Sequence, residues 1–216
     1  MASIQFKFNP DKVYFTSDMH CGHSKIIEYC NRPFASAEEM NETLINNWNK
    51  KIPDDGIVFD LGDFAIGGSK VWNDTLSRLK GKHYLIKGNH DEKNYRESYS
   101  KYFELVTQQM YIQVEDVSIY LNHFPFLCFG GSYREQHNVW QCFGHVHSGP
   151  YRISGKDIQR CRILFPTQYD VGVDNNNFTP VSFWEVKEII EKQIKEYKIN
   201  NNVYTKEYSL DSTDNL

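Results

Sequence analysis

KVYFTSDMH, residues 12–20, joins a short apolar run to two side chains that commonly bind metals, Asp18 and His20. Because β-branched and aromatic residues favour strands, we expect a strand over residues 12–17. The pattern recurs, since the apolar runs at 57–60 and 83–86 are soon followed by Asp63 and Asn89. Ligand-type residues that follow successive strands indicate a site at one edge of a sheet, where open α/β folds bind ligands.

Helical patterns separate these strands. Ser36 and Glu39 form a capping box before a helix with an apolar face, and residues 70–79 form a second helix that Gly81 stops. The alternation of strands and helices predicts an α/β layer on a parallel sheet.

The second half changes character. It contains short strand candidates at residues 111–114, 117–121, 139–143, 162–165, 169–173 and 181–184, and then a charged helix over 185–198. We therefore expect one domain with two β layers over residues 1–200, followed by a polar C-terminal tail over 201–216.

Size and composition bound the function. The chain has 216 residues, of which 40% are hydrophobic, and a net charge of -4. The acidic balance argues against a broad basic face for long duplex nucleic acid. We expect no secretory signal and no membrane helix, which needs about 20 apolar residues. The five cysteines form no Cys-x-x-Cys pair, so we expect reduced thiols and a cytoplasmic location.

Seven side chains make a candidate metal site, and they lack thiolates. Such a nitrogen and oxygen set suits Mn, Fe, Zn, Ni or Co better than Mg or Ca. Seven ligands exceed the needs of one tetrahedral ion but fit two divalent ions that share a bridging carboxylate. Residues at i and i+2 of an extended strand point the same way, which would aim paired ligands together. The seven are Asp18, His20, Asp63, Asn89, His123, His145 and His147.

Charge indicates the substrate class. Two divalent ions bring four positive charges, and two aspartates with one hydroxide remove three. The remaining positive charge suits an anionic phosphoryl group. Paired ions about 3.5–4 Å apart can clamp the attacking and leaving oxygens of a displacement at phosphorus.

The order of the motifs carries a family resemblance. Asp-x-His at 18–20, Gly-Asp at 62–63, Gly-Asn-His-Asp at 88–91, Asn-His at 122–123 and Gly-His-x-His at 144–147 resemble the motif series of the calcineurin-like metallophosphoesterases. The resemblance implies a four-layer α/β/β/α sandwich with a dinuclear metal site at the strand ends, Mn being the favoured metal.

The resemblance also implies roles for single residues. Asp63 would bridge two ions, and His90, oriented by Asp91, would contact the phosphate and stabilise the transition state or protonate the leaving group. One ion would be held by Asp18, His20 and His147, and the other by Asn89, His123 and His145.

A finer resemblance covers residues 18–34, which look like a group of small bacterial and phage phosphoesterases. This similarity makes His23 and Arg32 candidates for a substrate-facing rim, with Asn89 beside them. Arg32 would suit a phosphate through its planar fork of donors, but it is also suited to pairing with an acid or capping a helix. Cys21 is expected to be a packed thiol or a wall of the site.

We expect hydrolysis of a small phosphate ester. The chain has little room for a cap domain, but the loops at 128–138 and 148–159 could shape a modest pocket. An open small site favours a phosphodiesterase acting on nucleotide-type substrates. The alternatives are a phosphomonoesterase, including a phosphoprotein phosphatase, and a non-catalytic binding scaffold. The sequence leaves the oligomeric state open.

Overall fold

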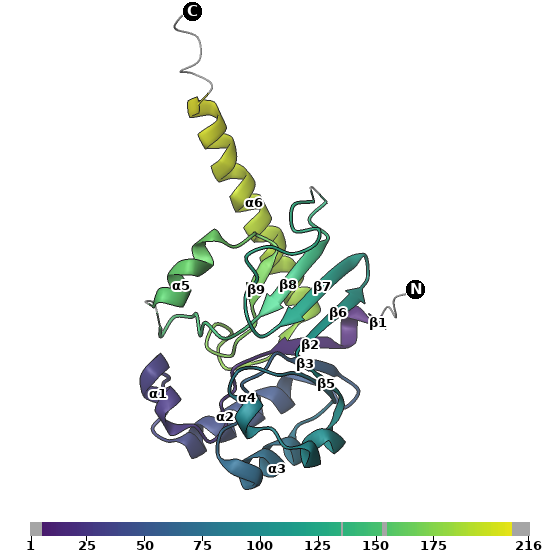
Figure 1. Cartoon of the computed structure of the whole chain (residues 1–216), viewed down its shortest axis with the longest axis vertical. Helices are drawn as coiled ribbons and strands as arrows, with labels where there is room; N and C mark the ends of the chain where they lie inside the picture. Colours follow the sequence, from purple (N-terminus) through teal and green to yellow (C-terminus); the bar gives the residue numbers. More distant parts are fainter. Residues whose placement is uncertain (1–5, 135, 153–154, 209–216) are drawn as a thin grey trace, which may run out of the picture.

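Two five-stranded sheets form the centre of the protein (Figure 1). The structure is a computed structural model that describes residues 6–134, 136–152 and 155–208. In order across the first sheet lie β1 (Phe6–Phe8), β6 (Gln109–Val114), β7 (Val117–Asn122), β8 (Val139–Phe143) and β9 (Gln168–Asp170). In order across the second lie β10 (Val181–Ser182), β2 (Val13–Thr16), β3 (Ile57–Asp60), β4 (Lys82–Ile86) and β5 (Phe103–Thr107).

Parallel pairing brings strand ends of like direction together. Strands β2, β3, β4 and β5 run parallel, and β10 joins their sheet antiparallel to β2. In the first sheet β7, β8 and β9 are parallel to one another. Each sheet therefore collects the carboxyl ends of at least three neighbouring strands at one edge.

The main core lies between the two sheets. Phe15 and Phe59 of the second sheet stack with ring centroids 5.8 Å apart, and they share a buried cluster with Ile112, Ile119 and Leu121 of the first. Strand β7 alternates buried and partly buried residues, as a sheet with one covered face should. Strand β8 is buried throughout, so it is covered on both faces.

Helices cover both sides of the sheet pair. On the outer face of the second sheet lie α1 (Ser24–Cys30), α2 (Ala37–Lys51), α3 (Gly68–Arg78) and the short α4 (Asp91–Asn94) (Figure 1). The second core joins Leu44 and Trp48 of α2 to Val58 and Leu85 of the sheet. On the side of the first sheet lie α5 (Lys156–Arg160) and α6 (Phe183–Tyr208). This mixed α/β fold with two sheets is the expected fold class.

Two local expectations were wrong. Residues 162–165 do not form a strand, because Cys161–Ile163 is a 3-10 helix. The expected strand at 181–184 stops after two residues. The Ser182 backbone N–H donates to the Glu185 carboxylate at 2.8 Å, and this cap starts α6 at once. Helix α6 is longer than the helix expected over 185–198, since it extends to Tyr208. The single domain over residues 1–200 and the tail over 201–216 stay a prediction.

Two further observations concern the chain as a whole. Among the described residues, none of the helices has both the length and the apolar character to cross a membrane. The five cysteines are all free thiols.

Candidate metal centre

Loops that follow strands of both sheets meet at one edge of the molecule. Backbone bonds from Asp18 N–H to the Gly62 carbonyl (2.8 Å) and from His20 N–H to the Asp63 carbonyl (2.9 Å) continue the β2–β3 pairing beyond the strands. A bond from Val173 N–H to the Ser17 carbonyl (3.0 Å) links the loop after β9 to the loop after β2. The carboxyl ends of the two sheets are thereby joined.

Five of the seven candidate ligands have a rare backbone conformation. Positive φ angles occur at Asp18 (60°), His20 (52°), Asp63 (55°), His145 (70°) and His147 (50°). Left-handed backbone at non-glycine residues costs on the order of 1–3 kcal/mol each and clusters at functional sites. The explanation from extended-strand spacing was therefore wrong, because the paired ligands converge through tight left-handed turns beyond the strands.

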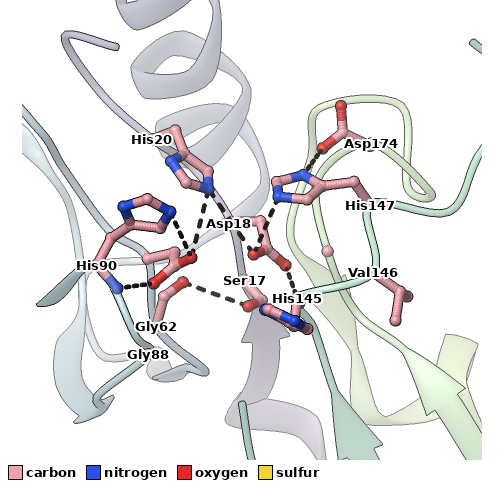
Figure 2. A network of polar contacts seen from close by, with 12 residues as sticks. Ser17, Asp18, His20, Gly62, Gly88, His90, His145, Val146, His147 and Asp174 are labelled. Carbon is pink, nitrogen blue, oxygen red and sulfur yellow. Dashed lines mark hydrogen bonds and ion pairs between the residues drawn. The ribbon is translucent and has the colours of Figure 1, made fainter. Parts of the chain in front are cut away.

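Each of the two central carboxylates uses one oxygen for the backbone and keeps the other for the site. Asp18 Oδ2 accepts from His145 N–H at 2.9 Å, and Asp63 Oδ1 accepts from His90 N–H at 2.8 Å. The free Asp18 Oδ1 lies 3.7 Å from His147 Nε2 and 4.0 Å from His20 Nε2 (Figure 2). Both oxygens that remain free therefore face imidazole nitrogens.

Asp63 Oδ2 lies between two groups of imidazoles. It is 3.6 Å from His20 Nε2 and 3.4 Å from His123 Nε2. Asn89 reaches the same region, with its Oδ1 3.1 Å from His123 Nε2. One carboxylate oxygen thus borders both halves of the cluster, as a bridging ligand would.

The imidazoles are held from behind. His123 Nδ1 lies 2.8 Å from the Leu61 carbonyl, and His147 Nδ1 lies 2.8 Å from Asp174 Oδ2. A histidine that donates from Nδ1 leaves Nε2 as an acceptor, and metal-binding histidines are usually oriented in this way. The Nε2 atoms of both rings accordingly face the two aspartates.

Two buried atoms of the cluster lack a partner in the described part of the chain. They are Asp18 Oδ1 and His20 Nε2. Buried polar groups are almost always satisfied, so an orphaned pair requires an explanation such as an ion. Ligand atoms of two groups lie within 4.8 Å of one another, namely Asp18 with His20 and His147, and Asp63 with His123 and His145. These residues fit a pair of divalent cations.

Proton affinity in the cluster reflects its crowding. Burial lowers the pKa of His20 well below its ordinary value, and the nearby His147 lowers it further. Burial alone would lower the pKa of His123, but the Asp63 hydrogen bond and the Asp18 charge raise it to about 9. A metal ion that binds His123 must displace the proton that this ring holds at neutral pH. The metal affinity of the cluster should therefore decrease as the pH falls.

The model of the calcineurin-like phosphoesterase family matches residues 11–171, which include every candidate ligand. The chain belongs to the calcineurin-like phosphoesterase family. As a metallophosphoesterase it is a metal-binding hydrolase of phosphate esters, and its cluster of imidazoles and carboxylates fits this chemistry.

Relatives of this metallophosphoesterase come from archaea and phages. An uncharacterized protein, MJ1445 of Methanocaldococcus jannaschii, is 32% identical over 84% of this chain and 92% of its own. The Gene 66 protein of Mycobacterium phage D29 is 28% identical over 82% of this chain and 95% of its own. A solved protein of unknown function from Aquifex aeolicus, AQ665, shares the fold with a TM-score of 0.63, 24% identity and coverage of 82% and 98%.

His90 stands over the cluster of the phosphoesterase. Its side chain is 43% exposed, and its Nε2 lies 3.9 Å from Asp63 Oδ2 (Figure 2). Asp91 does not bond the His90 ring. Its buried carboxylate accepts instead from the backbone N–H groups of Asp63 (2.7 Å), Phe64 (3.1 Å) and Gly88 (2.9 Å). Asp91 therefore ties the loops after β3 and β4 together, and it orients His90 only through the backbone.

The structure buries Arg32 and leaves His23 partly exposed beside the cluster. Arg32 is buried, with 3% of its surface exposed, and its guanidinium binds Asp174, which is the alternative of pairing with an acid. His23 is partly buried, and its Nδ1 lies 3.3 Å from Nδ1 of His20. Cys21 is fully buried in the core under the second sheet, as a packed thiol.

The sequence analysis missed two carboxylates beside the metallophosphoesterase cluster. Asp170 ends β9 and accepts from Gly172 N–H (2.8 Å) and the Ser148 hydroxyl (2.5 Å). Asp174 contacts His147 and Arg32. Asp174 follows the strand expected at 169–173, so the rule that located the other acidic residues could have found it, whereas Asp170 lies inside that expected strand.

Two glycines of the family motifs are required by close approach. A Cβ on Gly88 would lie 2.3 Å from Asp63 Oδ1, and one on Gly144 would lie 2.0 Å from Ser17 Oγ and 2.4 Å from Asp18 Oδ2. None of these three side chains can move away, because all of them are buried.

Gly144→Ala should therefore displace Asp18 and weaken metal binding by about 10-fold or more, the size of effect seen when supports of metal ligands are removed. Calorimetric titration of Mn²⁺ into the ion-free protein would measure the loss. Gly130→Ala serves as the control, since its Cβ would meet only the Tyr120 hydroxyl, at 3.1 Å. Unchanged affinity in Gly144→Ala would contradict this description of the centre.

Proposed function

We propose that this metallophosphoesterase is a phosphodiesterase that acts on small, nucleotide-type substrates through two divalent ions, with Mn²⁺ as the favoured metal. Asp63 would bridge the ions, and His90 would stabilise the transition state or protonate the leaving group. The other ligands would be Asp18, His20 and His147 for one ion and Asn89, His123 and His145 for the other.

The observation that carries the diesterase proposal is a pair of hollows beside the cluster. One has a volume of about 480 Å³, and its walls include His145, Leu127 and Ile163. The other, of about 210 Å³, includes Asn89 in its wall. Phe124 lines both hollows, so it separates them. A diester carries two substituents on phosphorus, and two hollows beside one centre suit it better than a monoester.

The two hollows differ in chemistry. The larger contains strongly exposed apolar side chains, Leu127 at 71% and Ile163 at 68%, which suit a flat, weakly polar group such as a base. The smaller is lined by polar residues, including Lys87 and Gln108, which suit a sugar or a second phosphate.

Charge supports the same choice. Arg32 contacts the loop that carries Asp18, but its guanidinium is engaged by Asp174 rather than directed to substrate. The ions would then supply most of the positive charge of the site. A diester with one negative charge needs less compensation than a monoester with two, so the modest positive balance favours the diester.

The chain's own residues would position the reaction. Bound ions would polarise the ester and lower the pKa of an attacking water. The partly exposed His90 ring faces the cluster and could donate a proton to the leaving oxygen. Asp63 Oδ1 accepts a hydrogen bond from the His90 backbone N–H at 2.8 Å. This bond holds His90, the proposed proton donor, at a fixed distance from Asp63, the proposed bridging ligand.

A reducing, cytoplasmic environment fits the thiols. Cys21, Cys30 and Cys142 are buried and free, and oxidation would disturb the packing around them. The alternative activity is a phosphomonoesterase, and the non-catalytic scaffold is disfavoured because each expected ligand is present in the cluster.

Hydrolysis of two chromogenic esters tests the substrate class. Protein stripped of metal and reloaded with Mn²⁺ should turn over bis-(p-nitrophenyl) phosphate faster than p-nitrophenyl phosphate, because only the diester fills both hollows. Chelator should abolish the activity. Faster turnover of the monoester would replace the diesterase with the phosphomonoesterase.

His90→Ala should lower kcat by roughly 10²–10⁴-fold, as expected for a lost acid–base group, while both ions stay bound. Elemental analysis of the purified variant would measure the metal content. Asp63→Ala provides the contrast, since it should lose paired metal binding together with activity. Wild-type turnover in His90→Ala would remove His90 from the mechanism.

A further inference from the structure

Behind the candidate metal centre lies a buried ion pair that the sequence analysis did not anticipate as a unit. Arg32 donates from Nε to Asp174 Oδ1 (2.8 Å) and from Nη2 to Asp174 Oδ2 (2.7 Å), which is a two-pronged contact. The side chains are 0% and 2% exposed. Charges buried this deeply are costly unless their remaining bonds are made, so the further partners of the pair are informative.

Arg32 extends the pair to the loop after β2. Its Nη2 donates to the Asp18 carbonyl at 2.7 Å, and its Nη1 donates to the Met19 carbonyl at 3.0 Å. Asp18 adopts a left-handed backbone conformation at this point. The guanidinium thereby holds the turn that presents both Asp18 and His20 to the cluster.

Asp174 extends the pair to the loop after β8. Its Oδ2 accepts from His147 Nδ1 at 2.8 Å, which directs His147 Nε2 to within 3.7 Å of Asp18 Oδ1 (Figure 2). One ion pair is therefore in contact with the loops that provide all three residues of one ligand group, Asp18, His20 and His147.

The second ligand group does not share this support. His123 is oriented by the Leu61 carbonyl, and Asn89 follows a loop that the Asp91 carboxylate holds through Gly88 N–H. The described residues thus show two supports of different chemistry, an ion pair behind one ligand group and backbone contacts behind the other.

We propose that Arg32 and Asp174 form a positioning pair that sets the metal affinity of the Asp18, His20 and His147 subsite and leaves the other subsite nearly unaffected. The proposal rests on the two-ion site proposed above. It assigns Arg32 to the metal centre rather than to substrate binding. Neither residue contacts the reacting atoms.

A third metal position behind the centre is a weaker explanation of the same residues. Cys30, His147 and Asp174 also lie within ligand distance of one another. However, both oxygens of Asp174 already accept bonds from Arg32 and His147, and the Arg32 charge would repel a cation there. The geometry points to support of His147 instead.

Asp174→Asn tests the pair, because it keeps the shape but removes the charge that holds His147 and Arg32. Calorimetric titration of Mn²⁺ into ion-free wild-type protein should show two binding events. In the variant one event should weaken by about 10–100-fold, as for other supports of metal-binding histidines, and the other should change by less than about 3-fold. Electron paramagnetic resonance at two equivalents of Mn²⁺ should change from a spin-coupled pair to isolated ions.

Glu42→Gln is the matched control. Glu42 makes a two-pronged contact of the same kind with Arg78, at 2.6 Å for each bond, but on the surface. Its loss should leave both binding events unchanged. Arg32→Lys keeps the charge without the fork, and it should weaken the same single event if Asp174→Asn does not fold, as judged by circular dichroism of the ion-free protein.

The wild-type protein offers a measurement that needs no variant. Two-bond ¹H–¹⁵N spectra of the protein loaded with diamagnetic Zn²⁺ should show His147 protonated at Nδ1 and metal-bound through Nε2. Metal binding through Nδ1 would overturn the proposal, as would equal affinities in wild type and Asp174→Asn or equal weakening of both events. A wild-type protein that does not bind two metal ions would instead contradict the proposed function.

Discussion

The bond from His145 N–H to Asp18 Oδ2, at 2.9 Å, joins the two sheets at the edge where the candidate site lies. Asp18 follows β2 of the second sheet, and His145 follows β8 of the first. Gly144 has no side chain because a Cβ would collide with this contact. The bond occupies one Asp18 oxygen and leaves the other in the cluster, so the packing of the sandwich and the ligand geometry depend on the same atoms.

The apolar core stabilises the folded state, whereas the loops of the candidate site destabilise it. Apolar residues between the sheets, such as Phe15 and Ile119, are fully buried and supply favourable free energy roughly in proportion to the area removed from water. The loops at the strand ends offset part of that stability, because they contain left-handed backbone and buried atoms without a hydrogen-bond partner, such as Asp18 Oδ1. Bound cations would recover some of it, because a ligand that binds only the folded state stabilises that state.

The sequence predicted which residues meet at the candidate site better than it predicted the local backbone conformation there. The order of strand, then ligand-type residue, located the fold class and brought together residues as distant as Asp18 and His147, because parallel strands end at a common edge. The local path of the chain was predicted wrongly, since the left-handed turns at Asp18 and His145 depend on contacts between loops that no short pattern records. Arg32 was expected at a rim from the family resemblance, and its pairing with Asp174 could not be predicted from a local pattern because the two residues are 142 positions apart. The start of α6 was missed although Ser182 and Glu185 carry an ordinary capping signal.

The central proposal is that one buried cluster would hold two divalent ions, with Asp63 between them. Anomalous diffraction from crystals loaded with Mn²⁺ tests it directly. Two peaks about 3.5–4 Å apart, on either side of Asp63 Oδ2, would agree with the two-ion site. A single peak, or a peak at Cys30, His147 and Asp174 instead, would contradict it.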